Sequence, residues 1–237
     1  MAFRKFENNI TVLICVHSSM EMHDVLLDMA LQSLTEQTFK DFRVLIVADS
    51  CKRAETYQII DKYKDALDIS VLGHEKSGLA NAKNFGIDRI LTDWVAYLDA
   101  DDMYLPDKLQ KQIDFLSNHI EIDILGTHYF FVKHNMYYDA ENKFHIERGT
   151  LEKSCFEDNT YITHEEISNR IFEENVIGHG TVLMPTKIVK EIPYDTTDDW
   201  KGKEDWQLWK DCIKAGYKFA NLPERLYVYS IGTSVAR

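Results

Sequence analysis

Short apolar runs alternate with amphipathic segments along the first half of the chain. Continuous apolar runs of the length expected for buried strands occupy residues 10–16, 42–48 and 94–98. The segment between the first two runs carries apolar side chains at helical spacing, at Leu27, Ala30, Leu31 and Leu34. This order of strand, helix and strand predicts a right-handed βαβ unit.

The same order then repeats. Residues 56–63 predict a helix, residues 69–72 a short strand, and residues 79–90 a second helix that leads into the run at 94–98. We therefore expect four parallel strands, each followed by polar residues. Those residues would gather at the carboxyl edge of the sheet, where open α/β sheets bind their ligands.

The second half of the chain is patterned less regularly. Its expected elements are a helix that starts beside Pro106, a strand over 122–132, a helix within 164–173, a strand over 181–184, a helix from Asp205 to a stop at Gly216, and a last strand at Phe219 and 225–230. Residues 133–175 are more charged and less periodic than their surroundings. We expect them to form a variable insert that faces a partner.

Three carboxylates, Asp99, Asp101 and Asp102, directly follow the apolar run at 94–98. A strand that fixes the backbone would let their oxygens converge on Mg²⁺ or Mn²⁺, because these hard cations prefer oxygen ligands. Aspartate is also common in turns that cap a following helix. On this stretch alone, both interpretations stay open.

The composition is that of a soluble globular protein, with 45% hydrophobic and 28% charged residues among 237. The net charge of −12 argues against a nucleic acid partner, and a diphosphate ligand would need a metal ion as a bridge. The sequence has neither an apolar run long enough to span a bilayer nor a signal peptide. These features predict a cytoplasmic protein, with peripheral membrane association through a partner left open.

Several common sites are absent from the sequence. The turn after the first strand reads Cys15-Val-His-Ser-Ser-Met20, without the G-x-G-x-x-G of dinucleotide-binding oxidoreductases. A Walker A loop is also missing. The four cysteines lie far apart, so neither a zinc site nor a disulfide framework is indicated.

Six motifs follow one another along the chain. They are Cys15-Val-His-Ser18, Asp49, Gly78-Leu-Ala-Asn-Ala-Lys-Asn-Phe-Gly86-Ile, Leu98-Asp-Ala-Asp-Asp, Pro106-Asp-Lys-Leu and Glu204-Asp205. In this order they resemble the family 2 glycosyltransferases with a GT-A fold. The resemblance covers nearly the whole chain and is weak only across 133–175.

The resemblance implies an α/β protein with the GT-A fold: a Rossmann-like, mostly parallel central sheet with helices on both faces and a C-terminal acceptor-binding portion. It implies one domain over residues 1–237, with a nucleotide-sugar-binding half at 1–102 and an acceptor-binding half at 103–237. The expected reaction is the inverting transfer of a sugar from a UDP donor to a hydroxyl group of a glycan or lipid-linked acceptor. Mn²⁺ or Mg²⁺ would be the cofactor.

The resemblance also assigns roles to single residues. The donor site would contain Val16, His17, Ser18, Asp49, Lys83, Asp99 and Asp101; the metal site Asp101 and Asp102; the acceptor site Glu204, His179 and Trp206; and Asp205 would be the catalytic base. Asp49 would bind the uracil ring, and Asp102 would bind the ion directly or through water. Lys83 departs from the family's usual arginine, which keeps the positive charge but loses the planar fork of donors. His17-Ser18 also departs from the family's aromatic residue and asparagine.

Three of these residues also have ordinary structural explanations. Asp205 is well placed as an acidic residue at a helix N-terminus, where it stabilises the helix dipole. His179 lies between two glycines and suits a purely structural role. Trp206 suits a helix face that packs into the core.

The chemistry of the implied reaction agrees with the assignments. A divalent cation stabilises the charge of a departing diphosphate and makes an acidic protein compatible with an anionic donor. One carboxylate on the opposite face accepts the proton of the attacking hydroxyl, and a single displacement inverts the anomeric centre. A sugar-nucleotide nucleotidyltransferase and a catalytically silent nucleotide-sugar or glycan-binding module remain the alternatives. The sequence leaves the sugar, the acceptor and the oligomeric state open.

Overall fold

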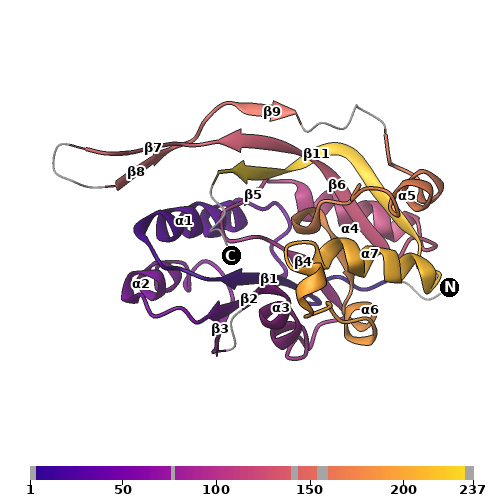
Figure 1. Cartoon of the computed structure of the whole chain (residues 1–237), viewed down its shortest axis with the longest axis horizontal. Helices are drawn as coiled ribbons and strands as arrows, with labels where there is room; N and C mark the ends of the chain where they lie inside the picture. Colours follow the sequence, from indigo (N-terminus) through magenta and orange to yellow (C-terminus); the bar gives the residue numbers. More distant parts are fainter. Residues whose placement is uncertain (1–3, 76–77, 140–143, 154–159, 233–237) are drawn as a thin grey trace.

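The computed structural model describes residues 4–75, 78–139, 144–153 and 160–232. The strands of its main sheet are β1 (Ile10–Val16), β2 (Phe42–Asp49), β3 (Ile69–His74), β4 (Trp94–Tyr97), β5 (Met103–Tyr104), β6 (Ile124–Lys133), β9 (Leu151–Lys153), β10 (Leu183–Pro185) and β11 (Phe219–Ile231). Within the described residues they form one nine-stranded sheet in the order β3-β2-β1-β4-β10-β6-β11-β5, with β9 beside β6. This sheet runs through both expected halves of the chain (Figure 1).

The strands β3, β2, β1 and β4 are parallel neighbours, which confirms the repeated strand-helix-strand order expected from the sequence. The β6–β11 ladder is also parallel and is the longest in the sheet. Between these two groups, β10 runs antiparallel to both β4 and β6. The sheet is therefore mixed but mostly parallel, as predicted for the fold class.

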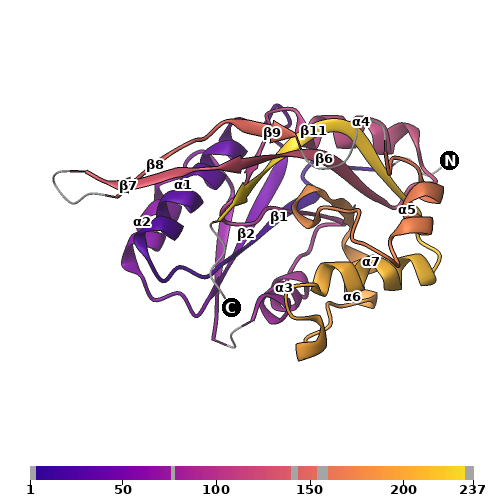
Figure 2. The ribbon, with the colours of Figure 1, turned by 45° about the horizontal axis from the view of Figure 1, so that its top comes forward.

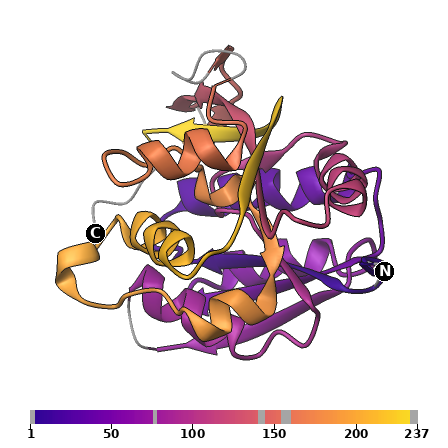
Figure 3. The ribbon, with the colours of Figure 1, turned by 90° about the vertical axis from the view of Figure 1, so that its right-hand side faces the viewer.

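Helices cover both faces of the sheet, as Figures 1 and 3 show. Their bounds are α1 (Glu21–Thr35), α2 (Ala54–Lys62), α3 (Leu79–Ile87), α4 (Lys108–Asn118), α5 (His164–Arg170), α6 (Thr186–Glu191) and α7 (Glu204–Lys214). Side chains alternate along β1, so Val12 packs with Leu31 of α1 in one core cluster while Leu13 packs with Ala82 of α3 in the other. Two hydrophobic layers thus enclose the sheet.

The last strand is longer than the sequence pattern predicts. We expected Phe219 and residues 225–230 as separate pieces, whereas β11 is continuous. Register shifts on either side of Arg225 let the parallel ladder with β6 continue past Pro223, which has no backbone N–H to donate. The short elements β5 and α6 were not predicted, because so few residues carry no readable periodicity.

The expected insert at 133–175 contains more regular structure than its single predicted helix, which is α5. β7 (Asn135–Tyr138) and β8 (Phe144–Glu147) form a separate antiparallel hairpin that extends away from the body of the molecule (Figure 1). β9 then returns to the edge of β6. Residues 140–143 and 154–159 of the insert lie outside the described part of the chain.

The helix α7 ends at Lys214, and Gly216, the stop that the sequence predicts, lies just beyond that end. This glycine has a φ of +90°, and its N–H donates to Ile213 O at 3.0 Å. The N–H of Tyr217 donates to Cys212 O at 3.1 Å, which completes a Schellman motif. The helix is thereby closed at its C-terminus.

Among the described residues, no helix is both long enough and apolar enough to cross a bilayer. Cys51 and Cys212 are buried thiols, and Cys15 is partly buried. Cys155 lies outside the described residues.

Candidate active site

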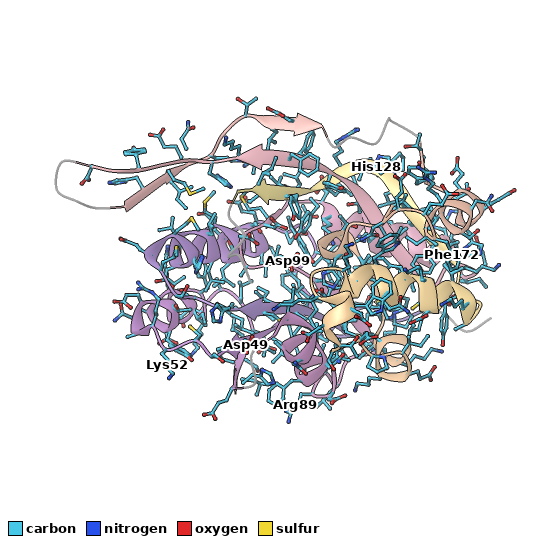
Figure 4. All side chains as sticks on the ribbon, in the orientation of Figure 1. Asp49, Lys52, Arg89, Asp99, His128 and Phe172 are labelled. Carbon is cyan, nitrogen blue, oxygen red and sulfur yellow. The ribbon has the colours of Figure 1, made fainter. Side chains whose placement is uncertain are left out.

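The carboxyl ends of the parallel strands bring predicted site residues to one edge of the sheet. β1 leads into His17, β2 ends at Asp49, and β4 leads through Leu98 into Asp99. The N–H of Leu98 donates to Leu13 O at 3.1 Å, so the β1–β4 pairing continues up to the acidic residues. Figure 4 labels Asp49 and Asp99, and both lie in the central part of the view.

Asp49 is buried at the end of β2, and both of its carboxylate oxygens have partners. Oδ1 lies 3.2 Å from His74 Nδ1, and Oδ2 accepts the N–H of Gly78 at 3.1 Å. Gly78 has a φ of +122°, which glycine adopts without the strain that a side chain would cause. The ring of His17 lies with Nδ1 2.9 Å from the carbonyl oxygen of Asp49. The predicted nucleoside contacts His17 and Asp49 are therefore direct neighbours, beside the buried end of β1 at Val16.

Ser18 is linked to a buried carboxylate that the sequence analysis did not single out. Asp24 accepts hydrogen bonds from Ser18 Oγ at 2.6 Å, from Thr56 Oγ1 at 2.5 Å and from Arg53 Nε at 2.7 Å. In the sequence Asp24 resembles any acidic residue in the first turn of a helix, so nothing marked it. Its role is to fix the loop after β1 to the start of α2, with the Ser18 hydroxyl hydrogen committed to it.

Asp102 is 1% exposed although it is a carboxylate. The Tyr227 hydroxyl donates to its Oδ2 at 2.6 Å, and the N–H of Ser230 donates to its Oδ1 at 2.7 Å. Burial raises the pKa of Asp102 well above its usual value, and the neighbouring Asp101 and Asp99 raise it further. With a protein donor on each oxygen, Asp102 anchors residues 99–102, which we call the acidic loop, to β11.

Asp99 and Asp101 are partly exposed on the same loop. Burial raises the pKa of Asp99 to about 6; the charge of Lys83 opposes this rise, whereas the charges of Asp101 and Asp205 add to it. Asp99 thus interacts electrostatically with α3, with its own loop and with α7. The acidic loop and the start of α7 are therefore parts of one site.

Lys83 on α3 is the cation at the centre of this site. It is 4% exposed, and its Nζ donates to Glu204 Oε1 at 2.9 Å. Burial lowers the pKa of Lys83, but the charges of Glu204, Asp99 and Asp205 outweigh burial and leave the pKa above its usual value. Lys83 therefore stays charged and partly neutralises three carboxylates from two elements.

Asp205 lies at the edge of a shallow pocket with a volume of about 380 Å³. The other residues that line this pocket are Glu173, Glu174, Asn175, Gly202, Lys203 and Trp206. Asp205 Oδ2 accepts the Asn175 amide at 3.0 Å, and its Oδ1 accepts the N–H of Trp206 at 2.7 Å. Asn175 Oδ1 in turn accepts the N–H of Ile177 at 3.2 Å, which requires the NH₂ group to face the carboxylate.

The pKa of Asp205 is raised, and burial is the largest cause. The Lys83 charge lowers it, the Glu204 charge raises it, and the hydrogen bonds from the Trp206 N–H and the Asn175 amide both lower it. The donors hold the carboxylate in one orientation and favour its ionised form. Asp205 is thus a partly exposed, oriented carboxylate with a raised proton affinity, which are the properties of a general base.

His179 is largely buried and belongs to an aromatic group. Its Nε2 lies 2.8 Å from the Tyr194 hydroxyl, and its ring centroid lies 4.4 Å from that of Tyr97. Burial, followed by the positive charge of Lys83, lowers the pKa of His179 well below its usual value. His179 is therefore a neutral, buried ring that packs against Tyr97 and Tyr194.

Of the other residues predicted for the acceptor, Trp206 lines the pocket beside Asp205 and Glu204 does not. The Trp206 indole N–H donates to Ile171 O at 2.5 Å, which fixes the orientation of the ring. Glu204 is 6% exposed and bonds to Lys83. Trp206 is thus partly buried and lines the pocket, whereas Glu204 is buried in the interior.

Asn175, Tyr227 and Ser230 hold the two key carboxylates, and sequence reasoning missed all three. Asn175 lies in the least periodic part of the chain, and Tyr227 and Ser230 lie in a strand that reads as ordinary core. Each bonds to a residue at least 30 positions away. No local pattern in one sequence signals contacts at that separation.

The described residues contain no group of three or more His, Cys, Asp or Glu side chains that is already arranged as a metal site. Mg²⁺ and related ions are often held by only one or two carboxylates together with phosphate oxygens of the substrate. Asp101 and Asp99 are partly exposed carboxylates on an anchored loop, so they fit an ion that is completed by a bound diphosphate. Asp102 fits less well, because both of its oxygens have protein donors.

The chain matches the model of the family described as "Glycosyl transferase family 2" over residues 11–184. It is 29% identical over 204 residues to an uncharacterized glycosyltransferase of Methanocaldococcus jannaschii, covering 85% of this chain and 64% of that one. It is 26% identical over 190 residues to the UDP-Glc:alpha-D-GlcNAc-diphosphoundecaprenol beta-1,3-glucosyltransferase WfaP of Escherichia coli, covering 80% and 66%.

Among solved structures, the fold is similar to that of S. aureus TarS 1–349 in complex with UDP. The TM-score is 0.70 at 18% sequence identity, and the match covers 94% of this chain and 60% of that one. This likeness confirms the GT-A fold predicted from the sequence. The chain spans about two thirds of the length of these relatives.

The buried Lys83–Glu204 pair leads to a prediction about stability. Lys83→Met should lower the free energy of unfolding by about 3–5 kcal/mol, because it leaves Glu204 uncompensated in the interior. Glu204→Gln should cost less, since Lys83 keeps the charges of Asp99 and Asp205 nearby. Urea denaturation of the two single variants and of the double variant measures these differences, and the double variant should cost less than the sum.

The matched control is Lys62→Met, which removes a surface lysine paired with Asp28 at 2.8 Å. An exposed ion pair contributes little to stability, so this change should be close to neutral. A loss from Lys83→Met no larger than that from Lys62→Met would contradict a structural role for the buried pair.

Proposed function

The chain belongs to glycosyl transferase family 2, a family of transferases, and on this premise we propose that it moves a sugar from a nucleoside diphosphate donor to a hydroxyl group of a glycan or lipid-linked acceptor, with inversion. The observation that carries the proposal is the buried Lys83–Glu204 bond. It holds the start of α7, with Asp205, beside the acidic loop that carries Asp99 and Asp101. This contact supports the proposal, because the reaction requires a leaving-group site and a base close together.

We assign the nucleoside to the edge formed by the ends of β1 and β2. Asp49 and His17 are hydrogen-bonded neighbours there, and Val16 closes the buried side. A uracil ring presents an N–H donor, and each Asp49 oxygen, which has one protein partner, keeps a second lone pair that can accept it. UDP is therefore the donor nucleotide that we propose, and Ser18 shapes the loop through its bond to Asp24.

We assign Mn²⁺ or Mg²⁺ to Asp101, with Asp99 beside it. When bound, such an ion would stabilise the negative charge on the departing diphosphate. Asp102 receives a positioning role, because the Tyr227 hydroxyl and the Ser230 N–H occupy its oxygens and so hold the loop for its neighbours. The positive charge of Lys83 lowers the pKa of Asp99 and so favours its ionised form.

We assign Asp205 as the general base that accepts the proton of the acceptor hydroxyl. Asp205 and Trp206 line the same shallow pocket, which is open to solvent, so an acceptor can reach the carboxylate there. Asn175 and the N–H of Trp206 keep the carboxylate oriented. Trp206 would contact the acceptor in this pocket. Glu204 and His179 would act from the interior, through their contacts with Lys83 and Tyr194.

The metal assignment predicts a loss of metal-dependent donor binding in Asp101→Asn. The amide is a weaker ligand for a hard cation than the carboxylate, so the part of UDP binding that requires Mn²⁺ should disappear. Isothermal titration calorimetry of UDP with Mn²⁺ and with EDTA measures it. Asp88→Asn, at an exposed carboxylate just after α3, is the control and should bind UDP like the wild type. Unchanged binding in Asp101→Asn would overturn the assignment.

The base assignment predicts that Asp205→Asn keeps UDP binding but loses transfer. A positioned base contributes roughly 10²–10⁴-fold, so kcat should fall by about that factor while the affinity for UDP stays the same. Donor turnover is measured over a panel of nucleotide sugars, with simple glycosides as acceptors. NMR of the wild-type product should show the anomeric configuration opposite to that of the donor. Near-normal turnover in Asp205→Asn would remove Asp205 as the base.

The hydrogen bond from Asn175 predicts a change in pH dependence. Asp205 must be ionised to act, so activity falls as the pH drops through its pKa. Asn175→Ala removes a donor that stabilises the ionised form, so the pKa of Asp205 should rise and the acidic limb of the kcat profile should move to higher pH. The control is Asn169→Ala, at an exposed asparagine of α5, which should leave the profile unchanged. Identical limbs in both variants would argue against this coupling.

A further inference from the structure

Three aromatic rings form a cluster on one face of the β6–β11 ladder. Tyr129 and Phe131 lie on β6, with ring centroids 5.3 Å apart and planes nearly perpendicular. Tyr229 lies on β11, with its ring centroid 5.7 Å from Phe131 and 6.3 Å from Tyr129. We refer to these residues as the aromatic cluster. Figure 2 shows the two strands running side by side.

The register of the ladder decides which face the cluster occupies. Tyr227 is paired with Tyr129 and Tyr229 with Phe131, so all four side chains project to the same side. Tyr227 is the residue whose hydroxyl donates to Asp102 at 2.6 Å. The aromatic cluster therefore continues the surface that anchors the acidic loop.

The glycines of the Gly178-His179-Gly180 turn fit against the same face. A Cβ atom on Gly178 would meet the Tyr129 ring at 3.2 Å, and one on Gly180 would overlap the Tyr227 hydroxyl. The turn and the strands are thus in close contact. As a result, the aromatic cluster lies beside both the acidic loop and the supporting His179.

The cluster is only partly buried, although it lies on the longest ladder of the sheet. Tyr229 is 44% exposed, and Tyr129 and Phe131 are partly exposed. Tyr129 packs against the main core, but within the described part of the chain neither Phe131 nor Tyr229 belongs to a hydrophobic core cluster. Large rings half open to solvent beside a candidate site are typical of ligand contacts.

The electrostatic surroundings connect Tyr229 with both parts of the candidate site. Burial raises the pKa of Tyr229 to about 12, and the charges of Asp102, Asp99, Asp101 and Asp205 add to the rise. The phenol therefore stays protonated and can donate a hydrogen bond. A ring face next to a hydroxyl donor and carboxylate acceptors presents the two kinds of group that a sugar offers, apolar C–H faces and hydroxyls.

We propose that Tyr129, Phe131 and Tyr229 form an acceptor subsite that stacks on the apolar face of a pyranose ring. The proposal rests on the proposed function for the identity of the neighbouring site. We assign the subsite to an acceptor and not to the nucleotide of the donor. The nucleoside is assigned to Asp49 at the end of β2, and the strands β1, β4 and β10 lie between β2 and β6 in the sheet. A sugar fits better than a lipid chain, because the nearby carboxylates would lose water against a lipid without gaining hydrogen bonds.

The test measures binding of methyl pyranosides of glucose, galactose, mannose and N-acetylglucosamine by saturation-transfer NMR, in the presence of UDP and Mg²⁺. Phe131→Ala and Tyr229→Ala should each weaken binding of the preferred pyranoside by about two- to tenfold, the range expected for losing one aromatic contact. Tyr229→Phe keeps the ring and should retain most of the affinity.

The control is Tyr137→Ala on the β7–β8 hairpin. Tyr137 is also 44% exposed but lies on a separate hairpin that extends away from the body of the molecule (Figure 1), and its hydroxyl donates to Glu147. This variant should bind pyranosides like the wild type. Equal effects of Tyr137→Ala and Tyr229→Ala would overturn the proposal, as would the absence of saturation transfer from every pyranoside in the panel.

Octyl glucoside, compared with methyl glucoside, separates a sugar from a lipid chain. If the alanine variants weaken only the octyl compound, the cluster binds a chain and the proposal is wrong. If they weaken UDP binding as much as pyranoside binding, the cluster belongs to the donor site and the proposal is again wrong. Failure of the proposed function gives a different result. If the wild type binds pyranosides through the cluster but turns over no nucleotide sugar, the subsite is supported and the proposed transfer reaction is wrong.

Discussion

The buried bond between Lys83 and Glu204 is the constraint on which the candidate site depends. The two residues lie 121 positions apart, on α3 and α7, and their contact joins the strand-helix repeats of the first half to the last helix. A buried charge without a partner is costly, so each residue requires the other. Because Asp205 directly follows Glu204, this pairing also determines where the proposed base lies.

The site concentrates negative charge in a protein that is already acidic. Asp99, Glu204 and Asp205 lie around one lysine, and burial favours the neutral forms of Asp99 and Asp205. Such an arrangement is unfavourable unless cations compensate it. Lys83 supplies one fixed charge, and a divalent ion at the acidic loop would supply the rest when an anionic donor binds. The repulsion among these carboxylates would therefore be relieved by the divalent ion that they are proposed to bind.

The second half of the chain holds the acidic loop in position. The hydroxyl of Tyr227 and the N–H of Ser230 hold Asp102, and these residues come from β11, which is parallel to β6 and far from the loop in sequence. The same ladder presents Phe131 and Tyr229 toward solvent on the side of the loop. One strand pair therefore both positions the loop and offers a surface next to it, which links the architecture of the sheet to the proposed binding of two substrates.

By itself, the sequence determined the apolar runs of β1, β2 and β4, the strand-helix repeats between them and the position of Gly216, because each is a local pattern of spacing or backbone conformation. Its ordered motifs also identified the family. Only the tertiary structure decided that Lys83 pairs with Glu204, that Asn175 holds Asp205 and that Asp102 points into the interior. These contacts join residues far apart in the chain. Which of them are buried, and which lie close together, is determined only when the chain folds.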